Sequence, residues 1–470
     1  MKKIIVLILS VIMCFACIPL VACGGNTDPD WTTTGTLEKD ADGNVIFDNV
    51  EIRLSHVVTS EDKDVLESLI SDFNREYRDR ISVIPNSINE KSFETDIAKC
   101  ITNNNNAPDF IMSHQAGQKQ LFDLKMLQPY DDVMRESGIT LSLDDYSKSL
   151  STYSKYGGDE LYSVPCDAQS MMVLYNKKLL KACGYENLPS SHAELKAMAE
   201  TVKNKGYTPI AWSASMEQFQ TYMFITALMQ NGVKLYDASS YRAAWASDAE
   251  NLAAIKSAVQ AVKDLSDISS ANRSVKDILN DFLNDRSLFY VALPWNMRST
   301  LQAYANKYTD GKIDAVSESI GGTSIAKWFA VDPEKDYAAT VYGDAHFFAI
   351  TRSVTDITKK AAICEFVKWF TSKSSVQVKW GETGHLSVCN KVVSDDAYSE
   401  NFFTNNYVSR FYPDINKFAC TGQNPHFGDL RTYLGQIVIT ALNSANTSSV
   451  DDIIKSNQDQ YNGQIEIAGM

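Results

Sequence analysis

The stretch Val50-Glu51-Ile52-Arg53-Leu54 opens the part of the chain that decides the fold. Its apolar and charged residues alternate, which is the period of a half-buried β-strand. An amphipathic helix is predicted over 60–77, because apolar residues recur there every three or four positions. A strand over 81–84, a helix over 93–101 and a strand over 109–112 follow. This order of strands and helices indicates a parallel sheet covered by helices.

The same alternation returns later in the chain. Strands are predicted over 172–175, 209–212, 288–293 and 347–350, and helices over 195–205, 220–232, 251–265 and 359–371. The C-terminal third is predicted to be helical and to end around Asn462. We therefore expect an α/β protein of two lobes, each built on a mainly parallel sheet flanked by helices. The first lobe is assigned 50–165 plus about 316–378, and the second about 166–315 plus 379–470.

The chain begins with the pattern of a secretory signal. Met1-Lys2-Lys3 precedes an apolar run, which ends in Leu20-Val21-Ala22-Cys23. This ending resembles the lipobox of bacterial lipoproteins, in which the cysteine becomes the first mature residue and carries the lipid. The resemblance implies a signal peptide over 1–22, lipidation of Cys23 and a polar tether over 23–49. It places the protein on the extracytoplasmic face of the cell membrane.

Composition restricts the partners of the protein. Its 470 residues have a formal net charge of −14, and removal of the two lysines in 1–22 makes this −16. Such an acidic balance argues against nucleic acid as a partner, because phosphates require a basic surface. After residue 23, six cysteines remain without a C-x-x-C pair. This spacing favours free thiols, although a secreted chain can also form disulfides.

Six motifs follow one another along the chain: Asn104–Ile111 (NNNAPDFI), Leu161–Pro165 (LYSVP), Leu174–Leu180 (LYNKKLL), Asn187–Leu195 (NLPSSHAEL), Gly343–Ile350 (GDAHFFAI) and Ala361–Ser372 (AAICEFVKWFTS). In sequence and order this set resembles the motifs of family 1 extracellular solute-binding proteins, the carbohydrate-capturing subunits of ABC importers. Three positions depart from the family pattern. His192 replaces an aromatic residue, Leu293-Pro294-Trp295 stands where G-x-W is common, and Leu386-Ser387-Val388 replaces l-P-v.

The resemblance implies a two-lobed periplasmic-binding-protein-like fold of type II, with a hinge that lets the lobes close on a ligand. The ligand is expected to be a carbohydrate, and an oligosaccharide in particular, that is passed to ABC permease subunits. The protein is expected to be a monomer, to have no cofactor or metal and not to be an enzyme.

Polar and aromatic residues at the ends of predicted strands are candidates for the sugar site. Aromatic rings cover the apolar faces of sugars, and carboxylates, amides and imidazoles bind their hydroxyls. Open α/β sheets bind ligands at these strand ends. Each candidate could instead serve core packing or a local turn. The candidates are His56, His114, Gln115, Asp167, Trp212, Trp295, Asn296, Gly343, Asp344, His346 and Phe427.

Glycoside hydrolysis and metal capture are the alternative functions for such a chain. A secreted glycoside hydrolase needs only a pair of carboxylates, which a chain with 58 acidic residues can supply without a local motif. Metal capture is less favoured, because the six histidines are scattered without an H-x-x-x-H type of spacing.

Overall fold

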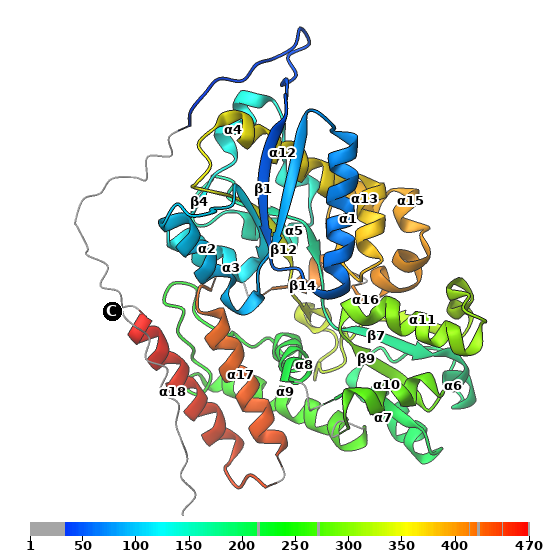
Figure 1. Ribbon diagram of the computed structural model, residues 1–470. Coiled ribbons are helices and arrows are strands. Elements are labelled where there is room, and N and C mark those ends of the chain that lie inside the picture. The colour runs from blue at the N-terminus through cyan, green and yellow to red at the C-terminus, as the bar shows by residue number, and fades with distance from the viewer. Residues whose placement is uncertain are drawn as a thin grey trace, which may run out of the picture.

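The structure is a computed structural model that describes residues 33–213, 217–269, 273–412, 414–420, 424–443 and 445–468. It has two lobes, the first in the upper and the second in the lower part of Figure 1. The predicted signal peptide and Cys23 lie outside the described residues. Within the described ranges, no helix is long and apolar enough to cross a membrane.

A mixed six-stranded sheet forms the centre of the first lobe. The central strand β1 runs parallel to both of its neighbours, whereas β12 runs antiparallel to β3, β4 and β5. The strand order is β2 (Ile81–Ser87), β1 (Val50–His56), β3 (Phe110–His114), β12 (His346–Thr351) and β4 (Leu127–Gln128), with β5 (Val164–Pro165) also paired to β12.

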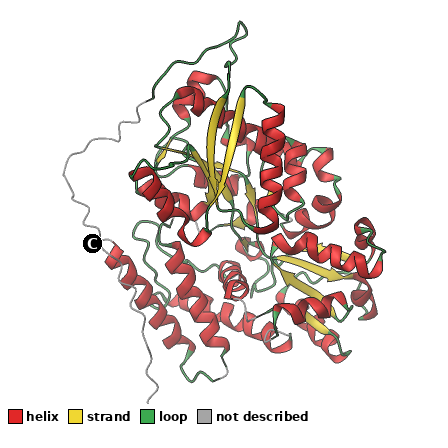
Figure 2. Ribbon diagram, in the orientation of Figure 1, coloured by secondary structure: helices red, strands yellow, loops and turns green. Residues whose placement is uncertain are grey.

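Helices cover both faces of this sheet, as the red and yellow ribbons of Figure 2 show. On one face, α1 (Ser60–Glu76) and α12 (Ile357–Ser372) share a core in which the rings of Phe73 and Phe366 lie 5.0 Å apart. On the other face, α2 (Phe93–Thr102) and α3 (Gln115–Asp123) bury a separate apolar cluster. The sheet is therefore held from both sides, and its strand ends are fixed at the edge that faces the second lobe.

The second lobe is built on four strands in the order β10 (Ile320–Thr323), β7 (Met172–Asn176), β9 (Ser287–Ala292) and β8 (Thr208–Ala211). Only β8 and β9 are parallel, because β7 runs opposite to both of its neighbours. The two-lobed α/β fold is confirmed, but this sheet has more antiparallel pairing than the sequence predicts.

Long helices pack beside this second sheet. They are α8 (Glu217–Gln230), α9 (Ala249–Ile268), α17 (Phe427–Leu442) and α18 (Val450–Ala468), which pack on one another. In the described ranges, the remaining α-helices of four residues or more are α4 (Asp131–Ser137), α5 (Lys148–Ser151), α6 (Lys177–Ala182), α7 (His192–Asn204), α10 (Val275–Leu283), α11 (Met297–Tyr308), α13 (Ser374–Gly381), α14 (Asn390–Val393) and α15 (Asp396–Ser399).

Two segments lie in the lobe opposite to the one assigned from sequence. The strand β10 pairs with β7, so the segment that begins near residue 316 continues the second lobe up to the hinge. Helix α13 continues beyond residue 378 and packs against α1 and α12 of the first lobe. The strand β10 escapes prediction because Gly321 and Gly322 interrupt its apolar pattern.

The segments that connect the lobes cross next to one another. β6 (Asp167–Ala168) pairs with β13 (Leu386–Ser387), and β11 (Val341–Tyr342) pairs with β14 (Phe418–Ala419). Gly343 lies at the crossing, where a Cβ atom would come within 2.3 Å of the Gln169 carbonyl oxygen and of the Phe418 ring. The absence of a side chain at Gly343 is therefore what lets the segments approach so closely.

The six cysteines in the described part of the chain are unpaired. Five of them are buried and Cys100 is half-buried. This agrees with the free thiols that their spacing favours.

Candidate ligand-binding cleft

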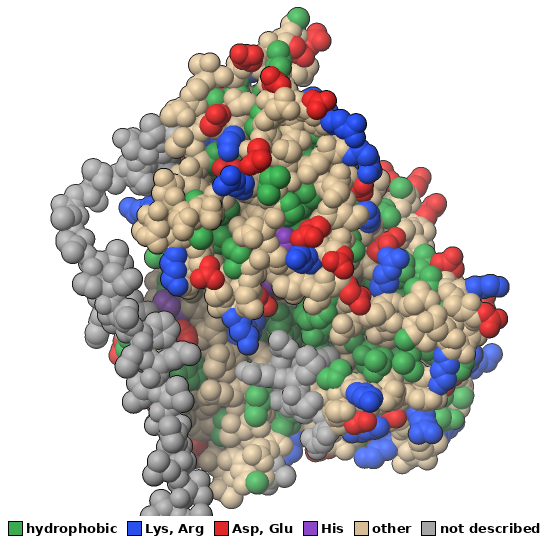
Figure 3. Space-filling view, in the orientation of Figure 1, with side chains coloured by type: hydrophobic (Ala, Val, Ile, Leu, Met, Phe, Trp, Pro, Cys, Tyr) green, Lys and Arg blue, Asp and Glu red, His purple; other side chains and the backbone are tan. Residues whose placement is uncertain are grey.

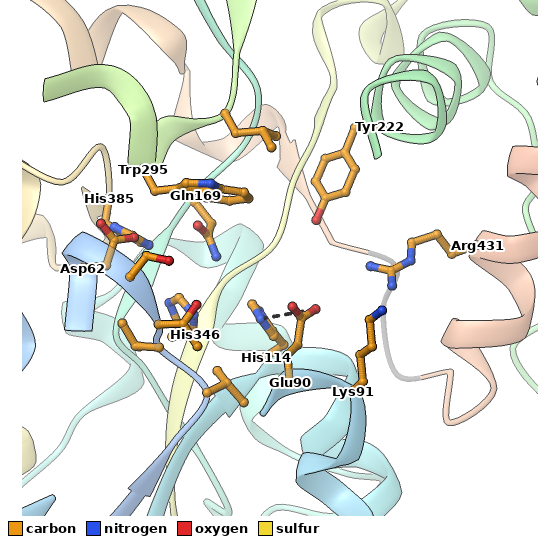
Figure 4. Close-up of a pocket in the computed structure, with 15 residues that line it drawn as sticks. Asp62, Glu90, Lys91, His114, Gln169, Tyr222, Trp295, His346, His385 and Arg431 are labelled. Carbon is orange, nitrogen blue, oxygen red and sulfur yellow. Dashed lines mark ion pairs between the residues drawn. The ribbon is translucent and has the colours of Figure 1, made fainter. Parts of the chain in front are cut away.

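A cavity of about 240 Å³ lies between the two lobes. The first lobe contributes the residues that follow β1 and the short helix η1 (Glu90–Ser92), whereas the second contributes Tyr222, Trp295 and Arg431. Gln169, His346 and His385 line it from the hinge side (Figure 4). An adjoining depression of about 230 Å³ shares Glu90, Lys91, His114 and Arg431 with this cavity. Figure 3 shows histidine and side chains of both charges along the boundary between the lobes.

Asp167 lies behind the floor of the cleft and binds the residues that form it. Its fully buried carboxylate accepts hydrogen bonds from His346 Nδ1 at 3.0 Å, from the His346 backbone N–H at 3.0 Å and from Trp380 Nε1 at 2.7 Å. Burial alone would favour the neutral acid, but the imidazoles of His346 and His385 and these hydrogen bonds hold the pKa of Asp167 well below its usual range. The charged carboxylate therefore fixes the orientation of the His346 ring.

Three histidine rings form a row along this floor. The centroid of the His346 ring lies 4.8 Å from that of His114 and 5.4 Å from that of His385. His385 stacks on Trp380, and its Nδ1 lies 2.7 Å from the Thr383 hydroxyl. Burial lowers the pKa of His385 to about 3, so its ring is neutral at pH 7 and can both donate and accept a hydrogen bond.

The His114 ring of this row lies between two acidic side chains. Its Nδ1 lies 3.1 Å from Asp344 Oδ2, and its Nε2 lies 3.8 Å from Glu90 Oε1. Burial opposes the charge on the ring, but the carboxylate of Asp344 outweighs it and the pKa of His114 rises to about 9. At pH 7 the cleft thus contains an imidazolium held between two carboxylates.

Asp62 contributes a neutral acid to the cavity. It belongs to the first turn of α1, lines the cavity and is only 7% exposed. Burial, together with the negative charges of Asp167 and Glu61, raises the pKa of Asp62 to about 8. A protonated carboxyl can donate to a sugar oxygen as well as accept from a hydroxyl. Asp62 is not among the site residues predicted from the sequence, although its place in the helix turn just after the β1 strand end could have identified it.

The structure brings six of the predicted site residues to the cleft or directly behind it. Trp295, His114 and His346 line the cavity, and Trp295 is 37% exposed. Asp344, Phe427 and again His114 line the adjoining depression. Asp167 lies one hydrogen bond behind the lining, through His346.

The other predicted site residues lie elsewhere. Trp212 is fully buried, and its Nε1 donates to the Ser269 hydroxyl at 2.6 Å, so it belongs to the core of the second lobe. His56 and Gln115 are buried within the first lobe without lining the cavity, and burial lowers the pKa of His56 to about 4. Asn296 is exposed beside Trp295, outside the lining, and Gly343 serves the hinge crossing.

Asp167, His346 and His385 come together although they are far apart in the sequence. Their ligand atoms lie within 4.8 Å of one another, and all three residues are buried. Such a set could in principle hold a metal ion. However, Asp167 already accepts three hydrogen bonds, which favours a role in orienting His346 over direct ligation.

Residues 59–377, most of the chain, match the bacterial extracellular solute-binding protein family. The chain therefore belongs to this family. A curated relative, the sn-glycerol-3-phosphate-binding periplasmic protein UgpB of Agrobacterium fabrum, is 24% identical over 164 residues. That match covers 34% of this chain and only 37% of the relative.

Solved structures of similar shape cover nearly the whole fold. The sugar-binding protein MalE of Xanthomonas citri has a TM-score of 0.72 at 15% identity, over 89% of this chain and 98% of that one. The cyclic alpha-maltosyl-1,6-maltose binding protein of Arthrobacter globiformis has a TM-score of 0.66 at 19% identity, over 89% and 99%. The galacto-N-biose-/lacto-N-biose I-binding protein of Bifidobacterium longum has a TM-score of 0.64 at 16% identity, over 90% and 98%. These likenesses establish the two-lobed fold.

Proposed function

We propose that this protein captures a carbohydrate between its two lobes and delivers it to the permease of an ABC transporter. It does so on the extracytoplasmic face of the membrane, where a lipid on Cys23 anchors it. The observation that carries this proposal is the half-exposed ring of Trp295 in a cavity otherwise rich in hydrogen-bonding side chains.

The chemistry of the cavity suits a sugar ring. Trp295 and Tyr222 supply aromatic surface for the apolar face of a pyranose. Asp62, Gln169 and His385 supply donors and acceptors for its hydroxyls. Several proteins of similar fold are named as sugar-binding proteins, which supports this ligand class.

The position of the cavity supports capture by closure. Its lining comes from both lobes, and the connecting segments cross at one place beside it. A ligand that contacts both lobes stabilises the closed arrangement over the open one. In this proposal the protein binds its sugar without changing it, unlike a glycoside hydrolase.

A thermal-shift screen over neutral and acidic mono- and oligosaccharides tests the proposal. A sugar present at about 100 times its Kd should stabilise the folded protein by about 2.7 kcal/mol. Chromatography of the same mixtures after long incubation should recover the sugar intact. Stabilisation by no sugar would contradict the proposal, and release of shorter sugars would favour the hydrolase instead.

A further inference from the structure

Two cationic side chains from opposite lobes face one another across the cleft. Lys91 extends from η1 in the first lobe and Arg431 from α17 in the second, and Figure 4 shows their charged ends pointing toward each other. Both line the main cavity and also the adjoining depression. Among the side chains that the structure describes, neither forms an ion pair with a carboxylate.

The nearby carboxylates are already engaged with another cation. Asp344 and Glu90 flank His114 at 3.1 and 3.8 Å. With His114 charged, these five groups carry three positive and two negative charges. Within the described residues, Lys91 and Arg431 are thus two cations of the cleft without a carboxylate partner, in a chain whose formal net charge is −14.

A third hydrogen-bond donor faces the same gap. The Tyr222 side chain comes from α8, and its hydroxyl points toward the space between Arg431 and the first lobe (Figure 4). Burial raises the pKa of Tyr222, so the hydroxyl keeps its proton. Lysine and arginine can only donate hydrogen bonds, and tyrosine readily does so. The three groups together match an acceptor that carries negative charge.

We propose that the captured carbohydrate carries an anionic group, a carboxylate or a phosphate, which binds between Lys91 and Arg431. This inference rests on the proposed function, because it specifies which class of sugar the cleft takes. When the lobes close, two like charges approach each other, and this opposes closure in the absence of an anion. A guanidinium binds a carboxylate or phosphate through two parallel hydrogen bonds, which would turn this repulsion into attraction.

Calorimetric titration with matched sugars tests the proposal. Each set contains a neutral sugar, its uronic acid and its phosphate, for example glucose, glucuronic acid and glucose 6-phosphate, with galactose and its derivatives as a second set. Galactobiose and digalacturonic acid extend the comparison to disaccharides, and inorganic phosphate serves as a free anion. We expect an acidic member to bind roughly 10- to 100-fold more tightly than its neutral counterpart. The uronic acid and phosphate arms identify which anion is preferred.

Substitutions connect this preference to the two cations. Arg431→Gln and Lys91→Gln should each bring the affinity ratio of acidic to neutral sugar down toward equality. Arg78→Gln and Lys312→Gln, at exposed positions outside the cleft lining, are matched controls that should keep the ratio. A rise in ionic strength should weaken binding of the acidic sugar more than that of the neutral one.

The outcomes separate this inference from the proposed function. Equal affinities for neutral and acidic sugars, unaltered in both cleft variants, would overturn the inference and leave carbohydrate capture intact. Binding of inorganic phosphate without binding of any sugar would overturn it in favour of a simple anion receptor. Binding of no compound in any set would overturn the proposed function and this inference with it.

Discussion

The Asp167 carboxylate lies 3.0 Å from the Nδ1 atom of His346. Asp167 belongs to the first segment that crosses between the lobes, and it fixes the imidazole of His346, which follows the second crossing segment. Trp380, from α13 of the first lobe, adds a hydrogen bond of 2.7 Å to the same carboxylate. Three segments that are distant in the sequence are thereby tied to one buried charge at the base of the cleft.

Asp167→Asn should lower the stability of the ligand-free protein. Loss of the charge leaves His346 and the Trp380 N–H with a weaker acceptor in a buried site, at a cost of about 3 kcal/mol. Because the pKa of Asp167 is lowered by folding, its contribution is present above the usual aspartate pKa and disappears as the pH falls through the folded-state value. Urea unfolding at pH 7 and at pH 3 measures this, and an equal difference at the two pH values would contradict it.

Asp62→Asn should instead stabilise the ligand-free protein at pH 8. The folded protein retains a proton on Asp62 up to a pKa of about 8, whereas the unfolded chain releases it near 3.8. Folding is therefore penalised increasingly as the pH rises between these values, by up to about 1.4 kcal/mol per pH unit. Melting temperatures of both proteins from pH 5 to 9 should diverge with rising pH. Asp64→Asn, at an exposed position of the same helix, should behave like the unchanged protein.

His114→Gln should lower the free energy of unfolding at low pH, and the loss should be much smaller at high pH. Folding raises the pKa of His114 to about 9, so the stability from its charge is complete below its ordinary value of 6.5 and disappears as the pH rises through 9. We expect a loss of about 1–3 kcal/mol at pH 6. Denaturant unfolding at pH 6 and 10 checks this, with His426→Gln as the control. A loss independent of pH would mean that the ring acts only by packing.

Trp295→Ala should lower sugar affinity, whereas Trp212→Ala should lower the stability of the fold. Trp295 is partly exposed in the cleft, so its removal should weaken sugar binding roughly 5- to 150-fold with little effect on the ligand-free melting temperature. Trp212 is buried and hydrogen-bonded to Ser269, so its removal should cost about 3–5 kcal/mol of stability. Calorimetric titration together with thermal unfolding distinguishes the two. A Trp295 variant with normal affinity would show that the ring does not contact the sugar.

Cys23→Ser should release the protein from the membrane. Cys23 follows Leu20-Val21-Ala22, and lipid chains are what would hold the mature protein at the bilayer. Expression in a bacterial host followed by detergent phase partitioning measures this. A processed variant that still enters the detergent phase would contradict lipid attachment at this residue.

Local periodicity predicted most of the secondary structure. The helix expected over 359–371 forms as Ile357–Ser372, and the strand expected over 288–293 forms as Ser287–Ala292. These elements are determined by the spacing of apolar residues that face a core. Lobe membership is less visible, because strands such as β10 are placed by pairing with a distant partner rather than by their own pattern.

The candidate site was only partly predictable for the same reason. Trp212 and Trp295 both follow an apolar strand, but Trp212 hydrogen-bonds to Ser269, just after the end of α9. Trp295 instead lies in the short helix Pro294–Asn296 and lines the cavity. Nothing in the local sequence distinguishes these outcomes. Lys91 and Arg431 are separated by hundreds of residues, and only the closure of two lobes on one cleft makes them neighbours.

The close crossing at Gly343 has a mechanical consequence for such a receptor. When two bodies rotate about a pivot, atoms near it travel a short arc and atoms far from it travel a long one. Asp167, His346 and Gln169, which lie at the crossing, would keep their spacing through closure, so the shape offered to the innermost sugar ring is constant. Lys91 and Arg431, which come from opposite lobes, would approach each other on closure. The surface near the crossing would thus select the size of the sugar ring, whereas Lys91 and Arg431 would hold the lobes closed on an anionic ligand.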